Sequence, residues 1–275
     1  MSKNYKEIYE ESLNNPEEFW KNVSEDVFWF KKPSKILNKS NPPFYKWFED
    51  GITNTCYNAL DHHIDQGRGD KTALIYDSPI TNNKAKFTFN ELKEKVSKFA
   101  GALDKEGVSK GDRVIIYMPM IPEAVVAMLA CGRIGAIHSV VFGGFASNEL
   151  ASRIDDSKAK ILITASCGFE PGRTVEYRPL VDGALKLAKH QVERVILFQR
   201  KDHEIKLNQP LEISWDEALS GASNKDCVEM GANDYAYILY TSGTTGIPKG
   251  IVRDIGGHIV ALKWTMKNIY NIDQD

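Results

Sequence analysis

The chain has 275 residues, of which 42% are hydrophobic and 26% are charged, and its formal net charge is −2. These proportions are typical of a globular protein that buries a sizeable core without disulfide staples. No long block of Lys or Arg indicates a nucleic-acid partner, and no apolar run approaches the length of a membrane span.

Residues 1–65 differ from the rest because they are rich in aromatic side chains. Asn15-Pro16-Glu17-Glu18 is a helix start with Pro at the first helical position. We expect short helices and loops here, with the aromatic rings as packing anchors against a larger body. The sequence therefore predicts a helical extension over residues 1–65 and a second domain over residues 66–275.

The four cysteines, Cys56, Cys131, Cys167 and Cys227, include no C-x-x-C pair. Reduced thiols are the simplest expectation, with Cys131 as a small buried apolar side chain. The first residues lack an apolar segment and carry acidic residues early, which argues against a targeting peptide. We therefore expect an intracellular protein, cytoplasmic first, with the mitochondrial matrix as the alternative.

From about residue 70, strand patterns and helix patterns alternate along the chain. Thr88 and Glu91 form a capping-box pattern that begins a helix, and Gly107 follows its predicted end. Apolar runs predict strands at residues 73–76, 114–118, 137–142, 161–164, 195–198 and 235–240. Helical spacing predicts further helices at residues 123–133, 147–154, 180–189 and 259–269.

Continuous apolar strands separated by helices indicate a parallel sheet that is covered on both faces. Right-handed crossovers then give an α/β fold with a doubly wound parallel sheet, in which ligands bind beyond the carboxyl ends of the strands. Residues 201–233 are more polar, and we expect a connection there with one strand near residues 211–215.

A loop of glycines and hydroxyls follows the strand at residues 235–240. Residues 241–250 read Thr-Ser-Gly-Thr-Thr-Gly-Ile-Pro-Lys-Gly. The glycines let backbone N–H groups approach polyphosphate oxygens, the hydroxyls add donors, and Lys249 adds a positive charge. Pro248 and Gly250 flank Lys249, so the loop is not a Walker A motif. A surface turn without a ligand is the alternative, which the length of the pattern disfavours.

This run of residues resembles the signature of the adenylate-forming enzymes: acyl-CoA synthetases, luciferases and peptide-synthetase adenylation domains. The resemblance implies that the loop holds the β- and γ-phosphates of ATP with Mg²⁺ while a carboxylate attacks the α-phosphate. CoA then converts the acyl-adenylate to a thioester. The implied phosphate contacts are Thr241, Ser242, Gly243, Thr244, Thr245, Gly246 and Lys249.

Two segments resemble the CoA-contacting parts of the acetyl- and propionyl-CoA synthetases. In residues 136–145, the resemblance places Phe142, Gly143 and Gly144 near the nucleotide of CoA, although a tight Gly-Gly turn is the structural alternative. In residues 163–173, Arg173 stands where the family has an arginine facing the CoA 3′-phosphate. Glu170 stands where the acetyl branch has a second arginine, so we expect it either to turn away or to pair with Arg173.

Residues 253–258 and the aromatic extension resemble the propionyl-CoA synthetase branch more than the acetyl branch. The implied partners are a short carboxylic acid, ATP, Mg²⁺ and CoA, with propionate first and acetate or butyrate possible. The resemblance covers nearly the whole chain and leaves open whether the protein is a monomer or a homo-oligomer. We expect no protein-bound metal: His62 and His63 are adjacent and diverge around a helix, and Mg²⁺ arrives with ATP.

The resemblance places the catalytic residues downstream of Asp275, so none is predicted in this chain. We therefore expect an incomplete, inactive portion of a ligase. A non-catalytic truncated product is the alternative from another class. A Ser-Lys amidase built on Ser242 and Lys249 is the rival enzyme, but the chain lacks a G-x-S-x-G elbow and a second serine motif.

Overall fold

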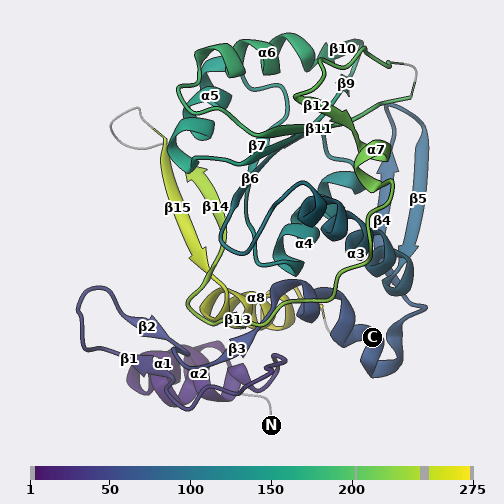
Figure 1. Cartoon of the computed structure of the whole chain (residues 1–275). Coiled ribbons are helices and arrows are strands. Elements are labelled where there is room, and N and C mark those ends of the chain that lie inside the picture. The colour runs from purple at the N-terminus through teal and green to yellow at the C-terminus, as the bar shows by residue number, and fades with distance from the viewer. Residues whose placement is uncertain (1–3, 202, 242–247, 273–275) are drawn as a thin grey trace.

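The computed structural model describes residues 4–201, 203–241 and 248–272 of the chain. Its centre is a seven-stranded sheet in the order β12-β11-β8-β6-β7-β14-β15. Every neighbouring pair in this sheet is parallel except β14 and β15, which are antiparallel (Figure 1). In that order the strands span Glu212–Ser214, Arg194–Phe198, Ile161–Ala165, Arg113–Met118, Ile137–Phe142, Tyr235–Thr241 and Lys249–Asp254. The predicted fold class is thus confirmed.

Helices connect the parallel strands and cover the sheet. They are α3 (Phe89–Lys105), α4 (Pro122–Arg133), α5 (Ser147–Ser157), α6 (Arg178–Leu187), α7 (Trp215–Leu219) and α8 (Gly256–Asn268). The chain moves from β6 to β7 in one direction and from β7 to β8 back across β6. Right-handed crossovers therefore place α4 and α5 on opposite faces of the sheet. In agreement, α3 packs against α4 and α5 packs against α6.

The helix starts follow the sequence signals. Thr88 and Glu91 form the predicted capping box of α3, and Gly107 adopts a φ of +83° just after the end of the helix. Pro16 and Pro122 occupy the first turns of α2 (Pro16–Ser24) and α4. Strand β8 is buried along its whole length, as its continuous apolar run predicts for a strand covered on both faces.

The segment at residues 73–76 lies outside the main sheet. It belongs to β4 (Thr72–Ser78), which pairs only with β5 (Asn83–Thr88) in an antiparallel hairpin. Ala73, Leu74 and Tyr76 pack partly on the core, whereas Ile75 is exposed. This hairpin is therefore covered on one side only, unlike the strands of a doubly covered sheet.

The connection at residues 201–233 contains the expected strand, β12, which joins the edge of the sheet in parallel with β11. It also contains α7 and β13 (Met230–Gly231), which the polar composition did not indicate. Strand β15 was not predicted either. Its residues are exposed along most of their length, so they carry no apolar periodicity from which to predict a strand.

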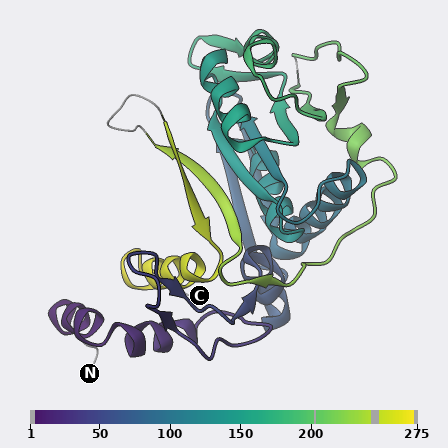
Figure 2. The same ribbon diagram turned by 60° about the vertical axis from the view of Figure 1, so that its left-hand side comes forward.

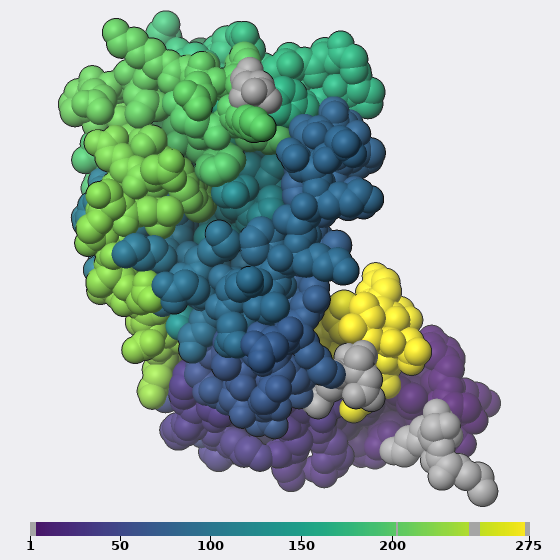
Figure 3. Space-filling view, turned by 90° about the vertical axis from the view of Figure 1, so that its right-hand side faces the viewer, coloured from purple at the N-terminus to yellow at the C-terminus, as the bar shows by residue number. Residues whose placement is uncertain are grey.

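The N-terminal segment contains α1 (Tyr5–Asn14), α2, the strands β1 (Leu37–Asn38), β2 (Lys46–Trp47) and β3 (Ile52–Thr53), and the π-helices η1 (Tyr57–Asp61) and η2 (Ile64–Arg68). Trp29 and Phe48 are buried together with Ile255 and Val260 in a second apolar core. Figure 3 shows the C-terminal residues, in yellow, lying against this segment, in purple. Other aromatic residues, Tyr5 among them, are exposed, so only part of the set anchors the extension.

The hairpin of β14 and β15 projects from the body of the molecule (Figure 2). Strand β14 pairs with β7 only between Tyr237 and His138. The outer part of the hairpin is attached to α5, where the Tyr240 hydroxyl donates to Asp156 Oδ2 at 2.6 Å and the Arg153 guanidinium lies 5.2 Å from the Tyr240 ring centre. No helix among the described residues combines the length and apolarity that crossing a membrane requires.

Candidate functional site

A groove lies between two antiparallel hairpins at the carboxyl end of the parallel strands. One hairpin is β4–β5, and the other is β9–β10 (Cys167–Glu170 and Arg173–Glu176). A cavity of about 840 Å³ and a neighbouring cavity of about 350 Å³ share lining residues that include Tyr76, Phe169 and Arg200. We refer to these two cavities together as the hairpin groove. This is the edge where open α/β sheets bind ligands.

Four of the five residues predicted to contact CoA line the hairpin groove. Phe142 and Gly143 line the smaller cavity, Arg173 lines the larger one, and Glu170 lines both. Gly144 does not line either cavity. Residues from two distant stretches of the sequence are therefore gathered at one place, and Phe142 presents an exposed aromatic ring there.

The Gly-Gly turn after β7 is dictated by packing. A Cβ atom on Gly143 would lie 2.2 Å from the Tyr177 hydroxyl and 2.8 Å from the Met118 carbonyl oxygen, and Gly144 has a φ of +95°. The Gly144 N–H donates to the Tyr117 hydroxyl at 3.1 Å, and that hydroxyl donates to the Phe145 carbonyl at 2.7 Å. Burial raises the pKa of Tyr117 to about 12, which keeps the hydroxyl protonated for this role.

We expect Gly143→Ala to destabilise the protein by about 1–3 kcal/mol, because the new methyl group meets a backbone carbonyl that cannot move away. Denaturant unfolding followed by circular dichroism measures the change. Gly132→Ala is the matched control, since its added Cβ meets atoms no closer than 3.9 Å and lies in a helix. The control is expected to be neutral or slightly stabilising. Equal losses in the two variants would contradict the packing argument.

Glu170 pairs with Arg173 rather than turning away. Its Oε2 atom accepts from Arg173 Nε at 2.7 Å and lies 2.6 Å from a second guanidinium nitrogen. The two residues face each other at the end of the β9–β10 hairpin. The Arg173 side chain is 71% exposed, so its guanidinium remains within reach of a ligand, but the carboxylate neutralises part of its charge.

The groove also contains basic side chains that the sequence patterns did not indicate as site residues. Arg200, Lys201 and Lys84 also line the larger cavity. Arg200 is 8% exposed, and its guanidinium carbon lies 4.9 Å from the Phe169 ring centre. Arg200 and Lys201 follow the strand at residues 195–198, so position at a strand's carboxyl end could have indicated them. Lys84 could not have been found, because its hairpin was not predicted.

The groove also contains Glu123, at the start of α4. Burial raises the pKa of this carboxyl, and its own backbone hydrogen bond opposes the rise. A carboxyl that is easier to protonate opposes an anionic ligand less than a fully ionised one. Lys84 pairs with Asp77 of the smaller cavity at 2.9 Å, so Arg200 and Lys201, together with the exposed Arg173, give the groove the positive charge that suits an anionic ligand.

The predicted phosphate loop begins and ends in the β14–β15 hairpin. Thr241 and Lys249 are register partners and are both exposed, and β14 runs parallel to β7, so they lie toward the carboxyl edge of the sheet. The other predicted phosphate contacts, Ser242, Gly243, Thr244, Thr245 and Gly246, lie outside the described residues. The structure therefore gives the position of the loop's two ends.

Comparison with known proteins adds an independent line of evidence. The family described as "AMP-binding enzyme" matches residues 60–275, and the family described as "Acetyl-coenzyme A synthetase N-terminus" matches residues 5–59. The chain is 51% identical over 269 residues to the acyl-CoA synthetase short-chain family member 3, mitochondrial, of Homo sapiens. It is 43% identical over 279 residues to the acetyl-coenzyme A synthetase of Xylella fastidiosa.

These alignments cover 98% of this chain, but only 39% of the human protein and 43% of the bacterial one. The chain thus spans about two fifths of the length of these relatives. Among solved structures, an acetoacetyl-CoA synthetase from Streptomyces lividans matches with a TM-score of 0.88 and 26% identity, over 98% of this chain and 41% of that one. The chain belongs to the AMP-binding enzyme family and is similar, within it, to the short-chain acyl-CoA and acetyl-CoA synthetases.

Proposed function

We propose that this chain supplies the CoA groove and the ATP phosphate loop of an AMP-forming short-chain acyl-CoA ligase. The observation that carries the proposal is the hairpin groove, which gathers Phe142, Gly143, Glu170 and Arg173 with Arg200 at the ligand-binding edge of the sheet. An aromatic ring beside exposed and buried guanidinium groups suits a nucleotide that carries phosphates.

The reaction proposed joins a carboxylic acid to CoA in two steps. The acid's carboxylate attacks the α-phosphate of ATP, which releases pyrophosphate, and the CoA thiolate then displaces AMP from the acyl-adenylate. Thr241, Lys249 and the residues between them hold the β- and γ-phosphates, and Mg²⁺ enters with ATP. Arg173 binds the 3′-phosphate of CoA, and Arg200 and Lys201 raise the positive potential of the same groove.

We further propose a short aliphatic acid as substrate, with propionate ahead of acetate and butyrate. The 51% identity to a short-chain family member supports a short acid, and the order rests on the resemblance of residues 253–258 and of the aromatic extension to the propionyl-CoA synthetase branch. One relative is mitochondrial and another is bacterial. We therefore propose an intracellular location, either the cytoplasm or the mitochondrial matrix. We also propose residue 65 as the limit of the N-terminal extension.

The activity is tested with the full-length natural protein, because this chain spans about two fifths of the length of its relatives. We expect release of AMP and pyrophosphate that requires the acid, ATP and CoA together, with the highest kcat/KM on propionate. We expect the 275-residue chain by itself to lack pyrophosphate exchange. Hydroxamate trapping with and without ATP separates this reaction from the amidase alternative. Hydroxamate formed without ATP would reject the ligase.

A further inference from the structure

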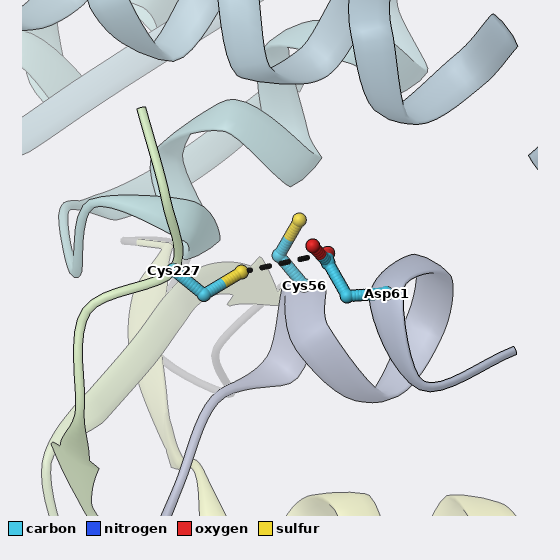
Figure 4. A group of neighbouring side chains, drawn as sticks. All are labelled: Cys56, Asp61 and Cys227. Atoms are coloured by element: carbon cyan, nitrogen blue, oxygen red, sulfur yellow. Dashed lines mark hydrogen bonds between the residues drawn. The ribbon is translucent and has the colours of Figure 1, made fainter. Parts of the chain in front are cut away.

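A cluster of reactive side chains lies away from the groove, where the N-terminal segment meets the end of α4. The sulfur atoms of Cys56 and Cys227 and a carboxylate oxygen of Asp61 lie within 4.8 Å of one another. Figure 4 shows the three side chains converging from the two ends of η1 and from the segment that precedes β13. Two thiols this close raise the question of whether they hold a metal ion or form a redox pair.

A guanidinium already occupies the position that a metal ion would need. Two nitrogens of Arg133 donate to the two carboxylate oxygens of Asp61, at 2.7 and 3.0 Å. One of these nitrogens also lies 3.1 Å from Cys227 Sγ and 3.6 Å from Cys56 Sγ. Lys93 Nζ lies 3.1 Å from the same carboxylate. A metal cation would have to displace the fully buried Arg133, so the geometry argues against a metal site.

The Arg133 guanidinium lies beside both sulfurs, and a positive charge at this place favours the thiolate form that reacts. Arg133 and Lys93 bring two positive charges, and Asp61 brings one negative charge. Burial acts to raise the pKa of Cys56, but the Cys227 thiol beside it and the charge of Arg133 outweigh burial, so the pKa is lowered. The pKa of Cys227 is raised, first by the nearby Cys56 and then by burial. The Cys227 thiol donates to Asp61 Oδ2 at 3.7 Å, the hydrogen bond that is dashed in Figure 4.

Hydrogen bonds to backbone carbonyls hold together the segments that carry the two cysteines. Asn54 Nδ2 donates to the carbonyls of Gly132 and Val228, at 2.9 Å each, and so joins the chain beside Cys56 to the chain beside Cys227. The Val228 N–H donates to the Arg133 carbonyl at 2.9 Å. Cys56 is fully buried, whereas Cys227 is partly exposed, so the pair has one side toward solvent.

We propose that Cys56 and Cys227 are a redox-active dithiol that closes to an intramolecular disulfide on reaction with a peroxide. Peroxide reaches the pair from the side of the partly exposed Cys227. One of the two sulfurs, as its thiolate, attacks hydrogen peroxide, so that an S–O bond forms, the O–O bond breaks and hydroxide leaves as water with the proton that the thiol gave up. The other sulfur then attacks the sulfenic acid, so that an S–S bond forms, the S–O bond breaks and a second water leaves with the proton of the second thiol. The two sulfurs together lose two electrons, and the peroxide gains them.

The disulfide would join the N-terminal segment to the chain that precedes β13 across a long loop. Such a link restricts the unfolded chain, so the oxidised protein is expected to melt several degrees higher than the reduced protein. The site is independent of the proposed ligase activity, because none of its residues lines the hairpin groove.

Peptide mapping of the peroxide-treated protein tests the proposal. After blocking of free thiols and digestion without reductant, we expect a Cys56–Cys227 cross-link that dithiothreitol reverses. Cys131, which lies outside this cluster in α4 and has its pKa raised to about 12 by burial, is the internal control and is expected to stay reduced. In Cys227→Ser and in Cys56→Ser no cross-link is expected to form, and dimedone labelling of the remaining cysteine identifies the sulfur that reacts with the peroxide.

The proposal fails if the wild-type protein keeps both thiols under conditions that oxidise free cysteine. It also fails if the protein binds one equivalent of Zn²⁺ that Cys227→Ser cannot bind. The wild-type mapping decides the proposal even if a variant does not fold, and circular dichroism checks each variant.

Discussion

Asp61→Asn is expected to lower the free energy of unfolding by about 3–5 kcal/mol, because it leaves the buried Arg133 guanidinium without its carboxylate. Arg133 is 0% exposed, and Asp61 accepts two hydrogen bonds from it and pairs with Lys93. The remaining acceptors, a backbone carbonyl and two sulfurs, do not replace a full negative charge. Denaturant unfolding of the reduced protein measures the loss.

Asp26→Asn is the matched control for this substitution. Asp26 pairs with Lys267 at 3.2 Å, but both side chains are exposed by more than two fifths. Exposed pairs of this kind contribute about 0–1 kcal/mol. If the two variants lost the same stability, burial would not be the reason that the Arg133–Asp61 pair matters.

The pH dependence of stability should also change in Asp61→Asn. Burial acts to raise the pKa of Asp61, but the hydrogen bond and charge of Arg133 overcome it and lower the pKa. A lowered folded pKa contributes stability that is present above the unfolded pKa and is lost as the pH falls through the folded pKa. The stability gap between the wild-type protein and Asp61→Asn is therefore expected to narrow in acid. A gap that widens in acid would contradict this sign.

Glu170→Gln is expected to raise the affinity of the full-length protein for CoA about fivefold, which corresponds to about 1 kcal/mol, the upper end for an exposed ion pair. The carboxylate holds two of the Arg173 guanidinium nitrogens, and its removal frees them for the 3′-phosphate. This prediction rests on the proposed CoA site. Calorimetric titration with CoA and with 3′-dephospho-CoA measures it, and the gain is expected for CoA alone.

Glu176→Gln removes the same charge from the facing strand of the hairpin. Glu176 is exposed and lines neither cavity of the hairpin groove, so CoA affinity should change less than twofold. Arg173→Ala should weaken CoA binding about tenfold and remove the preference over 3′-dephospho-CoA. An equal gain for both ligands in Glu170→Gln would place the 3′-phosphate elsewhere.

Local patterns in the sequence were enough to place the centre of the fold. Strands β6, β8 and β11 are runs of apolar residues, and such runs are stable only when both faces of a sheet are covered. The capping box at Thr88 and the proline at position 16 set helix starts through contacts within a few residues. The ends of the phosphate loop follow from β14, whose aromatic and apolar residues predict a strand.

Only the tertiary structure decided the contacts between distant segments. The residues of β4 read as a sheet strand, but one covered side leaves them in a separate hairpin, and that hairpin supplies one wall of the groove. Strand β15 has no apolar pattern because its residues are exposed. Cys56, Asp61, Arg133 and Cys227 come from three separate parts of the chain, and no local spacing joins them. They meet only because tertiary packing brings these segments together, which is a property of the folded chain and not of any window of its sequence.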